Sequence, residues 1–246
     1  MPRQRIEHDT TSLTSWSPSS RGPRFGPFPP NSFLGCLGEE QTDNLRQHLH
    51  VVYLRSGASL QLAPSRVLYL VMDGLAREVP LIGGAAHTTL RLPGDIIESS
   101  AVFDPAGKSV TVHGIRASLL GALPRAVFRR VLTEHPQAMA ALARSMTYRE
   151  KRDMFVNIHV RCGSAAVRIA RYLCFLADAL GDEDHQIVGF SQADIAQAVN
   201  ASRASAENFF REQREAGILT THYRSIRIHD MPGLRAQVGD MPIWRN

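Results

Sequence analysis

The stretch from Phe190 to Gly217 constrains the fold of this chain most, because it carries the signals for two short helices joined by a tight turn. Ser191 is a favourable N-cap, and Asp194 three residues later can bond back to the backbone N–H of the cap, a variant of the capping box. Asn200 stands where a helix-to-helix turn needs a left-handed residue, which Asn tolerates better than most residues. Ser202 is a second N-cap, so we expect the second helix to begin directly after it.

The two expected helices have distinct buried and outward faces. Phe209 and Phe210 supply the buried face of the second helix, and Gly217 is a natural residue to follow its last turn. Two capped helices and a short turn describe a helix-turn-helix, whose second helix enters the major groove of DNA. An ordinary helical hairpin of another all-α domain is the alternative. The outward face of the second helix carries Arg203, Ala204, Glu207 and Asn208.

A small β-hairpin is expected immediately after the second helix. Ile226 and Ile228 alternate with polar residues in the segment 225–228, and residues 218–221 form a matching strand. The turn between them contains Arg224. A hairpin in this position is typical of the wing of a winged helix, and it favours the DNA-binding interpretation over the helical hairpin.

These segments resemble the winged helix of the Crp/Fnr family of bacterial transcription regulators, and the resemblance spans roughly residues 31–238. It implies a homodimer that binds double-stranded DNA in the cytoplasm, with no membrane contact and with RNA polymerase as a candidate partner. The segments that carry it are Ser191–Ala196, Ala201–Arg203 and Arg214–Leu219, with the turn Leu92–Ile97 and the pairs Pro124-Arg125 and His135-Pro136.

The resemblance also implies roles in DNA binding. Arg203 matches the Ser-Arg motif of the family, and Arg and Asn can form bidentate hydrogen bonds with guanine and adenine respectively. Ala204 and Asn208 replace the usual Glu and second Arg of the family, so we expect a different operator. Gln192 and Ser202 are expected at phosphates, and Arg224 completes the candidate DNA-binding set. Residues 190–229 hold five arginines against four acidic residues, so phosphate binding must also use backbone amides and hydroxyls.

The length leaves room for two domains, and the composition is that of a globular protein. The chain has 246 residues, of which 43% are hydrophobic and 21% charged, and its net charge of +5 is compatible with nucleic acid. No apolar run of about 18 residues predicts a membrane span, and no signal-peptide pattern is present at the N-terminus. We found no nucleophile elbow, Walker A, zinc-protease or dinucleotide-binding motif, so we do not expect an enzyme.

We expect four regions and an α+β fold. Residues 1–30 are rich in proline and predict a disordered tail. Residues 31–134 contain short runs of period two between Gly and Pro turns, which predict an antiparallel, jelly-roll-like β-roll. The resemblance identifies this roll as a sensor domain of the cyclic-nucleotide-binding type. Residues 135–160 form a long dimerisation helix, and residues 161–246 form the winged helix-turn-helix domain.

Apolar residues in the long helix follow a 3-4 spacing, which predicts the seam of a two-stranded coiled coil. Two charged residues, Arg149 and Asp153, interrupt this seam in its middle. They either form a solvated pair one helical turn apart or face a pocket or a partner. The predicted dimer interface consists of Met139, Leu142, Met146, Val156 and Val160.

The residues expected to bind an effector depart from those of family members that bind cyclic AMP. Where these members carry Gly-Glu for the ribose, this chain has Glu98 and Ser99. Where they carry Arg for the cyclic phosphate, it has Lys108 followed by Ser109, and Lys cannot form the same bidentate contact. The adenine-contacting Thr-Ser pair of the family becomes Asp153-Met154. These departures argue against cyclic AMP and leave the effector unidentified, with Glu98, Ser99, Lys108, Ser109, Arg149 and Asp153 as pocket candidates.

The remaining alternatives concern other signals and another class of protein. Cys36, Cys162 and Cys174 lack the clustered spacing that an iron–sulfur site needs, and the sequence indicates no metal site. Regulation by haem, by a redox change or by a cyclic nucleotide is the alternative to an unidentified effector. A ligand-binding protein without DNA function is the competing class, and a salt titration of DNA binding would distinguish it. We predict no bound cofactor.

Overall fold

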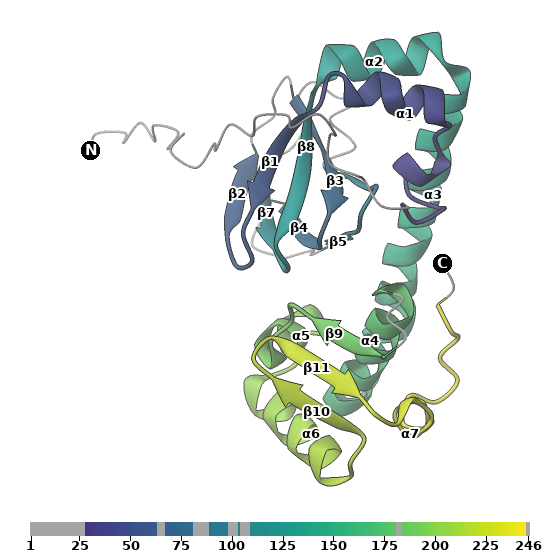
Figure 1. Cartoon of the computed structure of the whole chain (residues 1–246). Helices are drawn as coiled ribbons and strands as arrows, with labels where there is room; N and C mark the ends of the chain where they lie inside the picture. The colour runs from purple at the N-terminus through teal and green to yellow at the C-terminus, as the bar shows by residue number, and fades with distance from the viewer. Residues whose placement is uncertain are drawn as a thin grey trace, which may run out of the picture.

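A computed structural model describes residues 28–62, 67–80, 89–97, 103, 109–180 and 184–244 (Figure 1). An upper unit built of strands and a lower unit built of short helices and a small sheet are joined along one long helix (Figure 1). Most of the predicted tail, residues 1–27, lies outside the described residues.

The upper unit is a β-roll of two four-stranded antiparallel sheets, as predicted. One sheet has the order β1-β8-β3-β6 and the other β2-β7-β4-β5. Their facing sides enclose Val71, Ile97, Val112 and Leu120. The strands are β1 (His50–Leu54), β2 (Ser59–Leu62), β3 (Val67–Asp73), β4 (Ala76–Pro80), β5 (Thr89–Arg91), β6 (Ile96–Ile97), β7 (Val110–Gly114) and β8 (Ser118–Pro124).

Two of these strands were not predicted from the sequence. Strand β4 contains Arg77 and Glu78 at its centre, so it lacks the apolar alternation that marks a half-buried strand. Strand β6 has only two residues, Ile96 and Ile97, and is too short to give a periodic signal. Both strands exist because their neighbours β7, β5 and β3 supply the hydrogen bonds.

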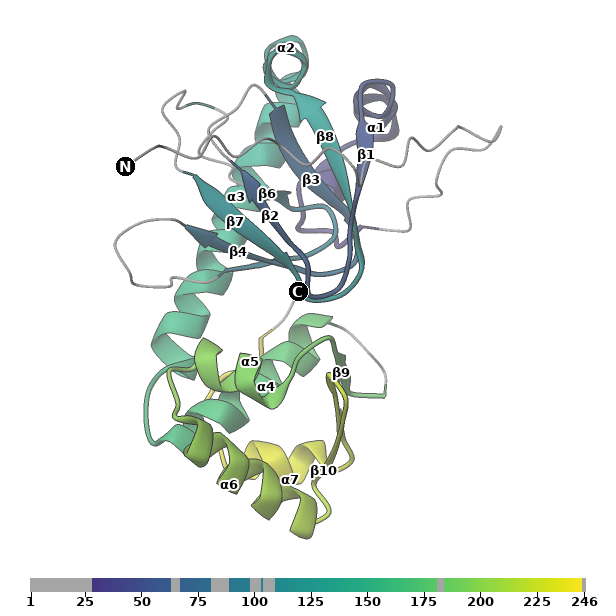
Figure 2. The ribbon, with the colours of Figure 1, turned by 90° about the vertical axis from the view of Figure 1, so that its left-hand side faces the viewer.

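Helices cover one side and one end of the roll (Figure 2). A single turn of 3-10 helix (Leu34–Cys36) and α1 (Glu39–Arg46) precede the strands, and α2 (Arg125–Glu134) follows them. The long helix α3 (Pro136–Phe155) begins with Pro at its first position, where the missing N–H has no cost. It continues into a π-helical turn, η4 (Val156–Val160), and then α4 (Ala165–Leu180) leads into the lower unit.

The predicted dimer seam is wrong at two of its five positions. Leu142 is 1% exposed in a core cluster with Phe33 and Phe128 of the same chain, and Val160 is fully buried in the core of the lower unit. Met146 and Val156 are partly buried and pack against these same two clusters. The apolar spacing therefore marks the face of the helix that packs against its own chain.

The opposite face of α3 is exposed and differs in composition from the predicted seam. Its residues repeat with alternating steps of three and four, which keeps them on one side of the helix. Of the predicted seam residues, only Met139 is exposed, at 39%. The exposed stripe consists of Ala140, Ala143, Thr147, Glu150, Met154 and Asn157.

The lower unit holds the expected pair of helices and the expected hairpin. The helices are α5 (Gln192–Ala198) and α6 (Arg203–Glu215), and the hairpin is β10 (Leu219–His222) with β11 (Ser225–Ile228). A third strand, β9 (Gln186–Val188), pairs with β11, and α7 (Met231–Ala236) follows the sheet. Neither β9 nor α7 was predicted, since each is too short to show a period.

The two units share an apolar contact. Leu75, Leu90, Leu92 and Ile115 of the roll belong to the same core cluster as Phe175 of α4 and the buried face of α6. The lower unit is therefore packed against one end of the roll in this structure.

Candidate nucleic-acid interface

Helix α5 begins with the capping box that the sequence predicts. The hydroxyl of Ser191 accepts a hydrogen bond from the backbone N–H of Asp194 at 3.1 Å, and the backbone N–H of Ser191 donates to the Asp194 carboxylate at 2.9 Å. These reciprocal bonds satisfy backbone donors that have no partner inside the helix.

The turn between the helices is also set by local chemistry. Asn200 has a φ of 53°, the left-handed conformation predicted for it. The backbone N–H of Ala201 then donates to the carbonyl of Ala196 at 2.8 Å, and the hydroxyl of Ser202 accepts from the backbone N–H of Ser205 at 3.1 Å. Helix α6 therefore begins at Arg203, directly after its cap.

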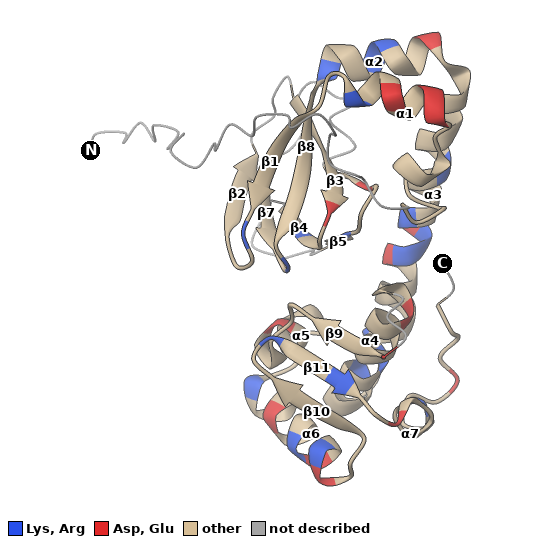
Figure 3. Cartoon of the chain, in the orientation of Figure 1, with Lys and Arg blue, Asp and Glu red and all other residues tan. Residues whose placement is uncertain are grey.

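Helix α6 divides into a buried and an exposed face. Ala206, Phe209 and Phe210 are buried in the core of the lower unit. The four outward residues predicted from the sequence, Arg203, Ala204, Glu207 and Asn208, are all exposed. Charges of both signs lie on this helix (Figure 3).

Two of these outward side chains have partners on the same helix. The Nε of Arg203 donates to Glu207 Oε1 at 2.7 Å, and the pair raises the pKa of Arg203. A terminal nitrogen of Arg211 donates to Asn208 Oδ1 at 2.9 Å. These bonds use the amide oxygen of Asn208 and the Nε of Arg203, and the Arg203 side chain remains 89% exposed.

A groove of about 510 Å³ lies between α5, α6 and the hairpin turn. Gln192, Arg203 and Glu207 line it from the two helices, and His222 and Tyr223 line it from the turn. Tyr223 is 93% exposed. Sequence reasoning did not select His222 and Tyr223. An aromatic residue at the tip of a hairpin could have indicated an interaction surface, because large aromatic side chains are usually buried.

Arg224 is partly engaged in holding the hairpin. It adopts a φ of 49°, and its guanidinium donates to the carbonyl of Gly189 at 2.6 Å and lies 3.5 Å from the Asp194 carboxylate. These contacts fix the turn against the start of α5. Gln192 also lies against the hairpin, 3.5 Å from the hydroxyl of Thr221. Ser202 is exposed at the start of α6.

A second hollow, of about 900 Å³, opens between the roll and the middle of α3. Its wall contains a buried ion pair in which Arg91 Nε donates to Glu78 Oε2 at 2.7 Å. Arg149 and Asp153 line it from the helix, so the structure brings these two predicted pocket residues together. The Arg149 guanidinium donates to the carbonyl of Ile96 at 3.0 Å, and burial, followed by the nearby charge of Arg91, lowers its pKa to about 10.

The other predicted pocket residues are placed differently. Glu98, Ser99 and Lys108 lie outside the described residues, and Ser109 does not line this hollow. Sequence reasoning missed both Glu78, which lies far from the motifs it used, and Arg91, which directly precedes the turn Leu92–Ile97. Neither residue gave a periodic signal, because Arg77 is also charged in β4 and because β5 has only three residues.

A buried ion pair anchors α3 to the roll beside this hollow. Arg152 donates to the Asp95 carboxylate at 3.1 Å and to the carbonyl of Leu90 at 2.8 Å. The two charged side chains are only 3% and 6% exposed. Asp95 also accepts from the backbone N–H of Leu92 at 3.0 Å, so its turn and the helix are held together.

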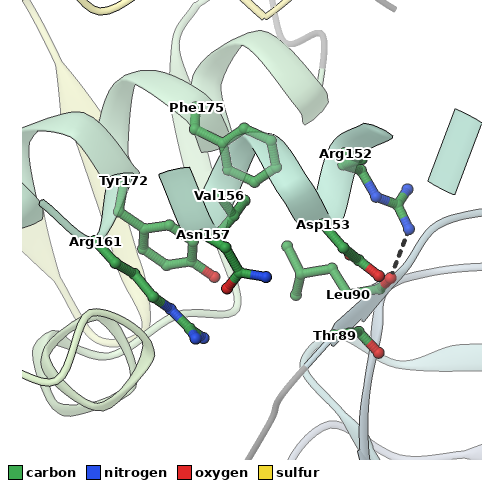
Figure 4. A pocket seen from close by; sticks show the side chains of 9 residues that line it. All are labelled: Thr89, Leu90, Arg152, Asp153, Val156, Asn157, Arg161, Tyr172 and Phe175. Atoms are coloured by element: carbon green, nitrogen blue, oxygen red, sulfur yellow. Dashed lines mark hydrogen bonds between the residues drawn. The ribbon is translucent and has the colours of Figure 1, made fainter. Parts of the chain in front are cut away.

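A small cavity of about 30 Å³ lies under the π-helical turn, where the roll, α3 and α4 meet (Figure 4). Burial raises the pKa of the Tyr172 hydroxyl, which lies in this lining. About 10–15 Å³ suffices for one water molecule, so the cavity suits one or two waters and excludes a nucleotide. Its polar lining includes Thr89, Asp153, Asn157, Arg161 and Tyr172.

Two further observations concern the part of the chain that the structure describes. Within it, no group of three or more His, Cys, Asp or Glu residues is arranged to hold a metal ion. No helix in this part is long and apolar enough to cross a membrane.

A β-roll, a long connecting helix with a hollow between it and the roll, and a winged helix-turn-helix together define a DNA-binding transcription regulator. Residues 167–237 match the Crp-like helix-turn-helix domain family. The transcriptional regulator LdrP of Thermus thermophilus is 32% identical over 180 residues, which cover 71% of this chain and 89% of LdrP. The chain belongs to the Crp/Fnr family of transcription regulators.

Solved structures of the family share the fold. TTHB099, a CRP-family transcriptional regulator from Thermus thermophilus, superimposes with a TM-score of 0.60 at 25% identity, covering 80% of this chain and 97% of that one. FixK2 from Bradyrhizobium japonicum gives a TM-score of 0.62 at 16% identity, covering 77% and 96%. The second likeness concerns the fold alone.

Proposed function

We propose that this protein is a homodimeric transcription regulator that binds a palindromic operator in the cytoplasm, under the control of a signal other than cyclic AMP. The two-fold axis of the dimer would set the two-fold symmetry of the operator. Half-sites should then lie about one helical turn, roughly 34 Å, apart.

The observation that carries the proposal is the exposed stripe of α3 together with the free outward face of α6. Small and apolar residues such as Ala143 and Met154 recur along the stripe, and they allow close approach of a second helix. We assign the dimer contact to this stripe and no longer to Leu142 and Val160. The region around Met139 and Met146 would lie at its edge.

The contacts with DNA divide into two kinds. Arg203 and Asn208 carry the groups that can bind base edges, so they would supply sequence preference. Gln192, Ser202 and Arg224 would bind phosphates and set the position of the protein. Ala204 would leave a neighbouring base without a polar contact, which supports an operator distinct from that of relatives with Glu at this place.

The hollow beside α3 supports a signal other than cyclic AMP. Its wall includes the carboxylates of Glu150 and Asp153, which would repel a cyclic phosphate, and the charge of Arg91 is already compensated by its pair with Glu78. Arg149 is bonded to a backbone carbonyl of the roll. The hollow therefore suits a ligand that differs in charge from a cyclic nucleotide.

The decisive experiment selects binding sites from random duplex DNA with the purified protein and then titrates salt. A dimer with about 6–10 phosphate contacts should lose roughly 10³–10⁵ in affinity between about 50 and 200 mM salt. Selection of a palindrome by a protein that sediments as a dimer would support the proposal. Failure to enrich any sequence, with no salt dependence, would refute it.

A further inference from the structure

The position of Glu207 needs an explanation beyond its place on the outward face of α6. This face must approach DNA phosphates if the proposed function holds, and a carboxylate there is repelled by them. Glu207 also lines the groove between the helices and the hairpin together with Arg203 and Gln192.

The bond between Glu207 and Arg203 uses only one edge of the guanidinium. Oε1 of Glu207 accepts from Nε of Arg203 at 2.7 Å. The two terminal nitrogens of Arg203 have no hydrogen-bond partner among the described residues, and its side chain is 89% exposed. A guanine edge offers O6 and N7 as two adjacent acceptors, which match those two terminal nitrogens.

Helix stability does not account for this pair. Arg203 is the first residue of α6, where the helix dipole disfavours a positive charge. For an ion pair four residues apart on a helix, the order Glu then Arg is more favourable than the order Arg then Glu found here. An exposed pair of this kind adds little stability in any case.

We propose that Glu207 is a positioning residue that holds Arg203 so that its two terminal nitrogens face one guanine in each half-site. This inference rests on the proposed function, since it assigns Arg203 to a base. Once the groove loses its water, the hydrogen bond that Arg203 donates to Glu207 strengthens, and the guanidinium compensates the charge of the carboxylate. Glu207 then acts through Arg203 and makes no base contact of its own.

The competing role for Glu207 is direct binding of cytosine, whose N4 amino group can donate to a carboxylate. The two roles differ in which base pair responds to a substitution. A positioning residue changes the preference at the base pair bound by Arg203, and a residue that binds cytosine changes the preference at another base pair.

The experiment measures competition between the selected operator and single-base variants for the wild type, Glu207→Ala, Glu207→Gln, Arg203→Ala and the double variant. Glu207→Ala should reduce discrimination at the Arg203 base pair about tenfold, the scale of a charge-assisted hydrogen bond. Glu207→Gln keeps an acceptor oxygen at the same distance along the side chain, so this variant should retain most of the discrimination at the Arg203 base pair. In the Arg203→Ala background, Glu207→Ala should have no further effect.

Glu215→Gln is the matched control, because it removes the same charge from the exposed end of α6. It should leave the preference at every base pair unchanged. Loss of preference at a different base pair in Glu207→Ala, or additive effects in the double variant, would overturn the positioning role while leaving the proposed function intact. A wild type that selects no operator would overturn the proposed function and this inference together.

Discussion

The guanidinium of Arg77, in strand β4 of the roll, donates a 3.2 Å hydrogen bond to the side-chain oxygen of Gln197 in α5. The same nitrogen lies 3.7 Å from the carboxylate of Asp194. The next residue of the strand, Glu78, points to the other side and pairs with Arg91 in the wall of the hollow. One short strand therefore contacts both the hollow and the first helix of the helix-turn-helix.

We expect Arg77→Ala to loosen the contact between the roll and α5. Removing one hydrogen bond of about 1 kcal/mol should speed amide hydrogen exchange in α5 roughly fivefold. Hydrogen-exchange mass spectrometry measures this, with Arg130→Ala on the exposed side of α2 as control. Unchanged exchange in α5 would show that the apolar contact alone holds the two units.

The dimer assignment predicts opposite outcomes for two adjacent positions on α3. Ala143→Glu places a charge in the exposed stripe and should give a folded monomer in sedimentation. Leu142→Glu buries a charge in the core and should instead destabilise the chain by several kcal/mol, about 3 or more. A dimer of Ala143→Glu with wild-type stability would contradict the assignment. Ala126→Glu, at an exposed position of α2, provides a control for the added negative charge.

The hairpin turn should contribute to DNA affinity without contributing to specificity. Tyr223 is exposed at the tip, so Tyr223→Ala should weaken binding to all sequences about equally, by roughly three- to tenfold. Fluorescence anisotropy with operator and unrelated DNA measures both affinities. Tyr53→Ala removes another exposed tyrosine, on the roll, and should have no effect. A loss confined to the operator would show that Tyr223 binds a base.

The ion pair between Arg152 and Asp95 predicts a non-additive effect on stability. Arg152→Met leaves a buried carboxylate without its partner and should lower the free energy of unfolding by about 3–5 kcal/mol. Adding Asp95→Asn removes the unpaired charge and should recover part of this loss. Urea unfolding of the wild type and of the two variants measures these differences. Equal losses in the single and double variants would argue that the charge of Asp95 is tolerated alone.

The cysteines should differ in reactivity. Burial raises the pKa of the Cys174 thiol to about 11, whereas Cys162 is exposed after the π-helical turn. Iodoacetamide at pH 8 should therefore modify Cys162 in the folded protein and reach Cys174 only after unfolding. Because the folded pKa is raised, the stability linked to Cys174 is complete below about pH 9 and is lost as the pH rises toward 11. Rapid modification of Cys174 would indicate that α4 opens easily.

The helix-turn-helix could be predicted in detail because its signals are local. The cap at Ser191, the turn at Asn200 and the cap at Ser202 each depend on bonds between residues at most five positions apart. Such bonds follow from residue type and spacing alone. The buried aromatic pair of α6 likewise needed only the helical period to be placed.

The face that α3 turns toward its own chain was decided by tertiary structure. A 3-4 spacing of apolar residues indicates that one face of a helix is buried. The spacing is the same whether that face packs against a sheet of the same chain or against a second copy of the chain. Leu142 is buried because the roll and α2 happen to lie against it. The sequence alone could not distinguish the two arrangements.

By itself the sequence determined the fold class and the outward face of α6, since these depend on short-range caps, turns and periods. The resemblance of its motifs supplied the family. Tertiary structure alone decided which distant polar side chains meet. Arg152 and Asp95 are 57 residues apart, and Arg77 and Gln197 are 120 residues apart. Pairs at such separations form only because sheet closure and domain packing bring the strands and helices together, and no local pattern records which strand will lie beside which helix.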